Sequence, residues 1–185
     1  NLSALGCMLE PSQKVAVSSP VPGVLDSVDV KRGDTVKAGK RLFQLKAGVE
    51  QEQVALAKAK ADFAERKAER NKALYKDDIL TMHERDEIET ELLLAKSEPR
   101  LRQEDAELRT VKSPISGVFV NRRYTKGEYV NVDPIIELSN LNPLHVDLLL
   151  PANYFGQIKK GQDLLINPES DLIQANKAKV DIVDP

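Results

Sequence analysis

Hydrophobic and polar residues alternate over short stretches in two regions of the chain, residues 15–45 and 110–139. Glycine and proline separate these stretches, which is the pattern of short strands joined by tight turns. Four glycines at matching places in the two regions are expected to occupy turns that disfavour a side chain. They are Gly23, Gly33, Gly117 and Gly127.

The two regions are copies of one unit. Ser-Pro-Val-Pro-Gly-Val begins at Ser19, and Ser-Pro-Ile-Ser-Gly-Val begins at Ser113, an offset of 94 residues. The same offset relates Val36 to Val130. A unit of this size is too small to bury a core by itself, so the copies are expected to pack as facing β-layers of one domain.

Between the copies the pattern changes to that of a helical insertion. Residues 49–109 contain no glycine and one proline, and they are rich in the strongest helix formers. In the first arm small or apolar residues follow one another in steps of three and four, which predicts a narrow seam for a close partner helix. These residues are Val54, Ala57, Ala61, Ala64 and Ala68. In the second arm Leu94, Leu101 and Leu108 recur every seven residues and are expected to face that seam.

The two arms are expected to meet at a turn within residues 76–82, where two aspartates interrupt the alanine-rich pattern. Thr81 can cap the second helix, because Glu84 follows three residues later as in a capping box. About 28 residues per arm at ~1.5 Å per residue give a hairpin roughly 40 Å long. Pro99 interrupts the second arm, and we expect a kink there or a helix restart capped by Ser97.

The C-terminal part of the chain is again rich in strands. The sequence predicts strands at 144–150, 164–167 and 178–183, with a short helix at 151–158 that ends near Gly161. Three strands rarely close into a barrel, so this domain is expected to be incomplete.

Composition and charge narrow the class of protein. Of the 185 residues 41% are hydrophobic and 4% are aromatic, which favours several thin modules over one wide aromatic core. With 27 basic and 29 acidic residues the net charge is −2, so the chain has no positive excess for phosphates and nucleic acid is not an expected partner. No apolar run approaches the ~20 residues needed to span a bilayer. Cys7 is interpreted as a strand residue and not as a lipid-anchor site.

Taken together, these features resemble the membrane fusion proteins, or periplasmic adaptor subunits, of Gram-negative efflux pumps and type I secretion systems. Residues 19–45 resemble the first lipoyl-like half of that family. Thr-Val-Lys-Ser-Pro-Ile-Ser-Gly, which begins at Thr110, resembles the return from the hairpin into the second half. Residues 141–162 resemble the start of the family's β-barrel domain.

The resemblance implies an α+β fold in an elongated modular protein. A lipoyl-like domain, or barrel-sandwich hybrid, is expected at 10–46 and 110–139, and an inserted antiparallel α-helical hairpin at 47–109. A partial β-barrel domain is expected at 1–9 and 140–185.

For function, the resemblance implies a non-enzymatic adaptor without a cofactor. Such an adaptor links an inner-membrane transporter to an outer-membrane channel in a tripartite efflux or secretion system. Its copies are expected to associate with one another in a ring, commonly of six. The expected location is the periplasm, with attachment to the inner membrane through a segment absent from this chain.

The resemblance also points to the hairpin tip. Adaptors of the resistance-nodulation-division class commonly place Arg, then Leu four residues on, then Ser seven further, where the channel docks. Arg70, Leu74 and Thr81 have this spacing, with Thr in place of Ser. An Arg can donate several hydrogen bonds, a Leu can fill an apolar groove and a hydroxyl can cap helix ends. In the alternative interpretation Arg70 is solvated, Leu74 packs within the hairpin and Thr81 is only an N-cap.

The sequence contains no recognisable catalytic or metal motif. His83 and His145 each lack a second ligand at metal-binding spacing, and no nucleophile or phosphate-binding motif is present. Two other functions remain open. The β-halves also resemble lipoyl or biotinyl carriers, for which Lys46 is the lysine nearest the junction, although the flanking residues of such sites are missing. The chain could also be a coiled-coil scaffold with no role in transport.

Overall fold

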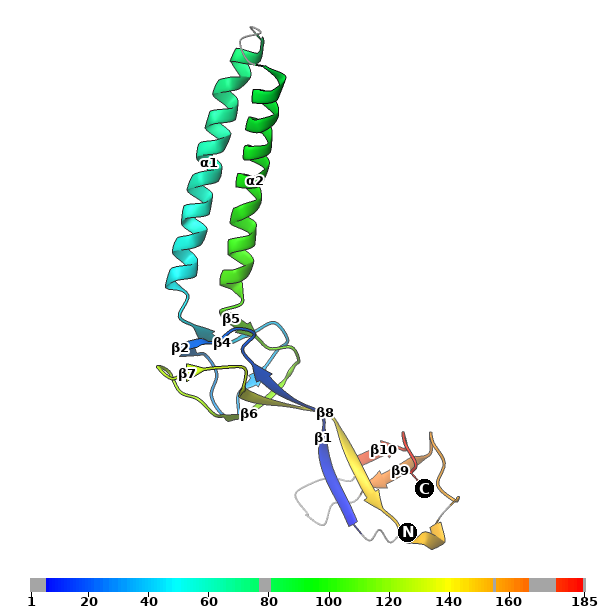
Figure 1. Cartoon of the computed structure of the whole chain (residues 1–185). Helices are drawn as coiled ribbons and strands as arrows, with labels where there is room; N and C mark the ends of the chain where they lie inside the picture. The colour runs from blue at the N-terminus through cyan, green and yellow to red at the C-terminus, as the bar shows by residue number, and fades with distance from the viewer. Residues whose placement is uncertain (1–5, 77–80, 155, 167–175, 185) are drawn as a thin grey trace. The chain divides into compact units, whose positions relative to one another are not determined.

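The computed structural model describes residues 6–76, 81–154, 156–166 and 176–184 and has an α+β fold (Figure 1). The chain forms two compact units. The larger unit comprises residues 14–139 and contains both helices, and the smaller unit combines residues 1–13 with 140–185.

Two four-stranded sheets account for the first eight strands, in the orders β1-β8-β6-β3 and β5-β4-β2-β7. The strand bounds are β1 Gly6–Ser18, β2 Gly23–Val28, β3 Thr35–Val36, β4 Arg41–Leu45, β5 Thr110–Lys112, β6 Gly117–Arg122, β7 Tyr129–Val130 and β8 Pro134–Leu149. Each sheet contains strands from both sequence copies. The expected arrangement of one layer per copy is therefore wrong, because the copies exchange strands.

The exchange of strands follows the sequence repeat. β2 pairs antiparallel with β7, and Gly23 lies opposite Val130. β6 pairs antiparallel with β3, and Gly117 lies opposite Val36. The 94-residue offset converts the first pairing into the second, so each copy supplies a short strand that completes the sheet of the other.

The two Ser-Pro motifs form equivalent bends. Ser19 Oγ donates a hydrogen bond to the Val21 carbonyl at 2.6 Å, and Ser113 Oγ donates one to the Ile115 carbonyl at 2.6 Å. Both serines are buried, so these local bonds satisfy hydroxyl groups that water does not reach.

The four predicted turn glycines fall into two groups. Gly33 and Gly127 lie in turns with φ of +92° and +94°, a conformation that L side chains rarely adopt. Gly23 and Gly117 instead begin strands β2 and β6 outside the left-handed region, so their assignment to turns is corrected. A Cβ at Gly23 would lie 2.7 Å from Arg109 Nη1, so close packing is what disfavours a side chain there.

The core of the larger unit is mostly aliphatic and draws on both copies. Burial of one large apolar side chain stabilises a fold by about 1.5–3 kcal/mol, so a set of this size can hold the unit together with few aromatic residues. The largest fully buried members are Phe43, Leu25, Leu42, Leu45, Ile135, Ile136, Leu138, Val36 and Val130.

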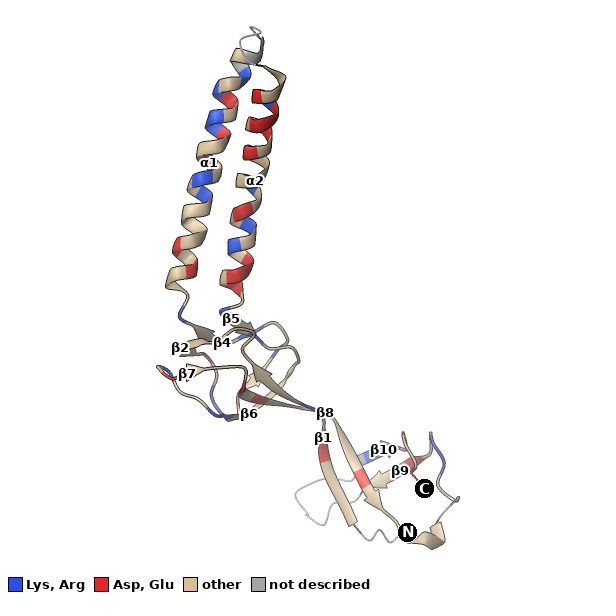
Figure 2. Cartoon of the chain, in the orientation of Figure 1, with Lys and Arg blue, Asp and Glu red and all other residues tan. Residues whose placement is uncertain are grey.

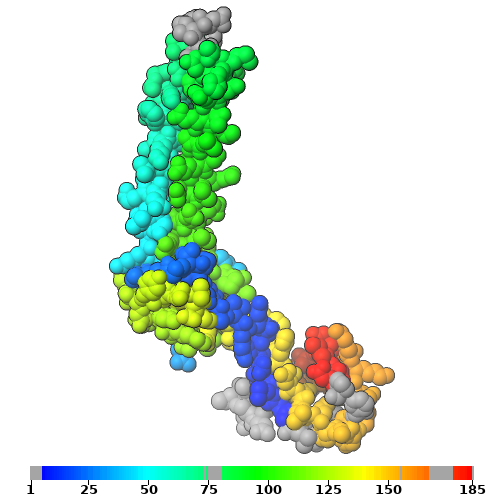
Figure 3. Space-filling model, viewed as in Figure 1, coloured from blue at the N-terminus to red at the C-terminus, as the bar shows by residue number. Residues whose placement is uncertain are grey.

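The helices α1 (Gly48–Lys76) and α2 (Met82–Glu107) form an antiparallel hairpin between β4 and β5 (Figure 1). Their side chains fill the space between the two ribbons (Figure 3). Val54, Ala57 and Ala64 are buried, which confirms the predicted seam of the first arm. The small alanine side chains let the second helix approach closely.

The facing side of α2 differs from the prediction. Leu94, Leu101 and Leu108 are 66%, 60% and 42% exposed, so the expectation that they form the seam is wrong. The side of α2 that faces α1 is formed instead by half-buried residues. These also recur every seven residues, but at positions different from those of the three leucines. They are Ile88, Leu92, Ala95, Pro99, Arg102 and Ala106.

α2 is continuous through Pro99, so the expected restart of the helix does not occur. Ser97 is not a cap, because its Oγ donates to the Leu93 carbonyl within the same helix at 2.9 Å. Pro99 lies half-buried on the side that faces α1, where packing offsets the cost of a proline inside a helix.

The smaller unit contains β9 (Asp163–Ile166) and β10 (Asn176–Lys179), which pair antiparallel. The short helix expected at 151–158 is reduced to a single 3-10 turn, η1 (Ala152–Tyr154). The strand expected at 144–150 is the end of the long β8. The strand expected at 178–183 begins earlier and ends at Lys179.

Candidate functional site

Arg109 holds the root of the hairpin to the sheets of the larger unit. Its Nη2 donates to Glu50 Oε1 in the first turn of α1 at 2.6 Å, and its Nη1 donates to the Pro22 carbonyl at 2.9 Å. The side chains of Arg109 and Glu50 are only 22% and 19% exposed, so water weakens this ion pair less than one at the surface. The sequence carries no local signal for this contact, because the two residues come together only in the folded hairpin.

Among the described residues, three ion pairs join the two helices along their length. They are Lys60–Glu98, Lys67–Glu91 and Lys96–Glu65, with N to O distances of 4.0, 2.5 and 2.6 Å. The hydrogen bond from Lys96, reinforced by its charge, lowers the pKa of Glu65 below its ordinary value. These exposed pairs add little stability each, but they fix the register of the two helices.

Thr81 is the N-cap of α2, as predicted from the capping box. Its backbone N–H donates to Glu84 Oε2 at 2.8 Å, and the Glu84 N–H donates back to Thr81 Oγ1 at 3.3 Å. The backbone N–H of Thr81, and then its hydroxyl, lower the pKa of Glu84. These contacts define where the second helix begins.

Arg70 and Leu74 lie one turn apart near the end of α1. Both are exposed, Leu74 by 38%. The Arg70 guanidinium, which carries five N–H donors, has no hydrogen-bond or ion-pair partner among the described residues. The expected turn falls partly on residues 77–80, which lie outside the described residues.

Large apolar side chains on the hairpin surface were not identified as exposed from the sequence. α1 exposes Val49, Leu56 and Phe63 at intervals of seven residues. The three leucines of α2 that were expected in the seam have the same spacing. A second apolar repeat beside the alanine seam is the sequence signal that could have identified them.

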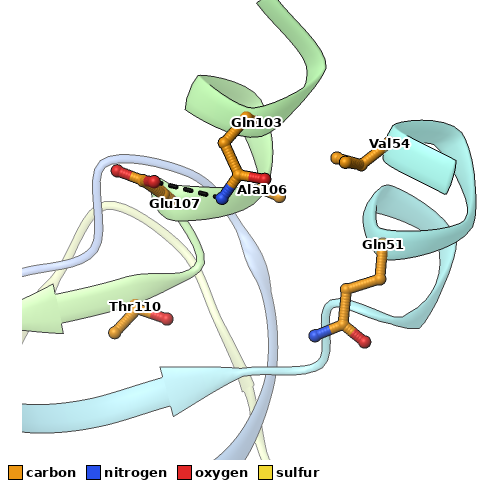
Figure 4. A pocket seen from close by; sticks show the side chains of 6 residues that line it. All are labelled: Gln51, Val54, Gln103, Ala106, Glu107 and Thr110. Carbon is orange, nitrogen blue, oxygen red and sulfur yellow. Dashed lines mark hydrogen bonds between the residues drawn. The ribbon is translucent and has the colours of Figure 1, made fainter. Parts of the chain in front are cut away.

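The hollow at the root of the hairpin does not have the form of a catalytic site. Its volume is about 220 Å³, below the ~300–1,000 Å³ of typical ligand pockets. The side chains that line it are Gln51, Val54, Gln103, Ala106, Glu107 and Thr110 (Figure 4). Gln103 Nε2 donates to Glu107 Oε1 at 3.1 Å, and the lining has no nucleophile with an adjacent base.

Within the described part of the chain, no cluster of three metal-binding side chains is present. His83 lies 3.3 Å from Glu87 on the surface of α2, and His145 lies in β8. None of the described helices is long and apolar enough to cross a bilayer.

A barrel-sandwich hybrid interrupted by a helical hairpin defines a membrane fusion protein of the periplasmic adaptor class. Residues 13–139 match the CzcB-like barrel-sandwich hybrid domain, and the chain belongs to this family.

Several curated relatives are efflux pump periplasmic linker proteins. The antibiotic efflux pump periplasmic linker protein ArpA of Pseudomonas putida is 29% identical over 135 residues, which cover 71% of this chain and 36% of ArpA. An uncharacterized protein of Haemophilus influenzae is 22% identical over 179 residues, 96% of this chain and 47% of that protein. The chain spans about a third to a half of the length of these relatives.

Solved structures share the fold. A MacA-MexA chimeric protein that contains the Pseudomonas aeruginosa MexA α-hairpin domain has a TM-score of 0.81 at 23% identity, over 97% of this chain and 66% of that chain. The membrane fusion protein Spr0693 of Streptococcus pneumoniae R6 has a TM-score of 0.74 at 16% identity, over 97% of this chain and 85% of that chain.

Proposed function

We propose that the chain is the hairpin-bearing part of a periplasmic adaptor that links an inner-membrane transporter to an outer-membrane channel in an efflux or secretion system. The protein acts by binding and has no enzymatic role. It is held at the inner membrane, and its copies associate with one another. Membership of the adaptor family and the efflux linkers among its relatives support this function.

The observation that carries the proposal is the exposed Arg70 near the end of α1, which has no ion-pair or hydrogen-bond partner among the described residues. Its guanidinium can donate to carbonyl or carboxylate oxygens of the channel, because the described residues leave its donors unused. Leu74, one turn further on, offers an apolar contact beside it. Thr81, the exposed N-cap of α2, is the third residue of the proposed contact.

An Arg70→Asp variant tests this function. In cells that make the whole pump, the adaptor is purified from membranes and the channel protein that accompanies it is quantified by mass spectrometry. We expect at least a tenfold loss of recovered channel and a matching loss of efflux, with unchanged helix content by circular dichroism.

Arg100→Asp is the matched control, since Arg100 is also an exposed arginine, but lies away from the tip on α2. It should leave channel recovery unchanged. Normal recovery and efflux with Arg70→Asp would contradict the assignment of the tip.

A further inference from the structure

Arg109 connects three parts of the larger unit at the root of the hairpin. It lies in the link of residues 108–109 between α2 and β5, and its carbonyl accepts a hydrogen bond from the Leu45 N–H of β4 at 2.8 Å. Its guanidinium donates to Glu50 in the first turn of α1 and to the Pro22 carbonyl just before β2. One residue therefore joins the inner ends of both helices to the sheets. We call Arg109 with these two acceptors the root clamp.

The root clamp is a directional contact. A guanidinium presents its donors in a rigid planar fork, so two acceptors on different elements fix its orientation. Gly23 leaves space for it, because a Cβ there would lie 2.7 Å from Arg109 Nη1. Both charged side chains of the clamp are mostly buried, whereas the ion pairs further along the helices are more exposed. The clamp is therefore better suited than those pairs to hold one geometry.

Apolar packing at the root is thin by comparison. A hollow of about 220 Å³ lies there, bordered by side chains of both helices and by Thr110 of β5 (Figure 4). Val49 and Leu108, the large apolar residues at the inner ends of the helices, are 68% and 42% exposed. The helices are thus not held by a packed core at this point, and the polar contacts of Arg109 brace them.

A small change of angle at the root becomes a large displacement at the tip. Helices of this length extend ~40 Å, so a tilt of about 10° moves the far end by roughly 7 Å. A hydrogen bond is lost once its two heavy atoms move apart by about 1 Å. Contacts made by the tip with another protein therefore require a hairpin of defined direction.

We propose that Arg109 is a positioning residue, which holds the hairpin at one angle to the sheets through the root clamp. The tip residues Arg70 and Leu74 then meet the channel from a defined direction. This inference rests on the proposed adaptor function and adds to it a residue at the opposite end of the hairpin. Without the clamp, the links at 46–47 and 108–109 act as a pivot, and the hollow gives the hairpin room to tilt.

A purely structural role of Arg109 makes a different prediction. If the ion pair only stabilised the fold, its loss would lower the free energy of unfolding, but the hairpin of the folded protein would keep its angle. The angle of the folded protein is therefore the quantity to measure.

Double electron–electron resonance measures this angle in the full-length protein. Spin labels are attached at two exposed positions through Thr90→Cys in α2 and Asn131→Cys after β7, with Cys7→Ser to remove the native exposed thiol. Samples are frozen from a temperature at which circular dichroism shows every variant to be folded. We expect Arg109→Gln to make the distribution of label distances at least twice as wide.

Glu50→Gln is a milder second variant, because it removes the charge of one acceptor and keeps the other bond of the clamp. It should widen the distribution by less than Arg109→Gln does. Arg102→Gln is the matched control, since Arg102 is a half-buried arginine of the hairpin whose ion pairs, at 3.7 and 4.0 Å, stay within α2. It should leave the width unchanged.

Recovery of the outer-membrane channel from cells that make the whole pump connects the angle with function. At equal amounts of adaptor in the membrane, we expect Arg109→Gln to lower the recovered channel at least threefold and Arg102→Gln to leave it unchanged. An unchanged distribution in Arg109→Gln, or equal widening by Arg102→Gln, would overturn the root clamp. A wider distribution with full recovery of the channel would overturn its role in positioning the tip.

Failure of the adaptor function would appear in a different measurement. It would leave channel recovery normal in Arg70→Asp, and it would not alter the distances between the spin labels.

Discussion

Two phenylalanines show how the sheets and the hairpin of the larger unit differ. Phe43 in β4 is fully buried in a core built from both sequence copies, whereas Phe63 in α1 is 55% exposed. The two sheets bury their large apolar side chains in the core, so these residues stabilise the fold. The hairpin has a thin seam of small residues and leaves large ones at the surface, so part of its sequence is free to serve binding.

The largest contrast is expected between Phe43→Ala and Phe63→Ala. Loss of a buried phenylalanine removes transfer free energy and leaves a cavity, which costs about 3–5 kcal/mol. Loss of the half-exposed one should cost less than about 1 kcal/mol. Urea titrations followed by circular dichroism give both values, and similar costs for the two variants would contradict the division between core and binding surface.

Gly23→Val should destabilise the larger unit by about 1–3 kcal/mol, because the new side chain displaces Arg109 from the Pro22 carbonyl. Gly48→Ala is the control, since its Cβ would meet open space. Thermal unfolding should show a lowered midpoint only for the first variant. An unchanged midpoint in Gly23→Val would mean that the hairpin root tolerates repacking.

Thr81→Ala should destabilise the start of α2 by about 1 kcal/mol, because it removes an N-cap hydroxyl. Thr81→Ser keeps the hydroxyl and should restore most of this loss. Hydrogen exchange of the amides in the first turn of α2 measures the effect locally. Equal exchange in the two variants would show that the hydroxyl does not stabilise the helix end.

Acid should loosen the hairpin by a small amount through Glu65 and Glu84. The pKa of each carboxyl is lower in the folded state than in the unfolded state, so each contributes stability above its unfolded pKa that is lost as pH falls through the folded pKa. Helix content should therefore fall below about pH 4.3, the ordinary glutamate value. Glu84→Gln should reduce this acid dependence, and an identical acid titration in that variant would show that the Glu84 carboxylate is not responsible.

The sheets were predictable where local chemistry repeats. The repeated Ser-Pro motifs gave equivalent bends, and the positive φ of Gly33 and Gly127 follows from their places in turns. The exchange of strands between the copies was not predictable, because pairing of β2 with β7 depends on contacts distant in sequence. Local sequence patterns specify the individual helices and strands, whereas the choice of which strands pair depends on the energy of the whole sheet.

The existence of the hairpin and the N-cap of its second helix were predicted from the sequence, but the apolar residues on its exposed surface were not. The capping box of Thr81 and Glu84 is local and was identified correctly. The assignment of the three α2 leucines to the seam was wrong. Two sets of residues in α2 recur every seven residues, and the spacing alone does not say which set faces α1. The small alanines of α1 allow a close partner helix, and Ala95 and Ala106 are among the half-buried residues of α2 that face them.

The most direct test places a photoreactive amino acid at Arg66, an exposed residue one turn before Arg70 on the same side of α1, or at Arg122, an exposed arginine of β6, in cells that make the whole pump. Irradiation should crosslink the outer-membrane channel to the adaptor from position 66 and not from position 122. Capture of the channel equally from both positions, or from position 122 alone, would contradict the claim that the hairpin tip is the surface that meets the channel.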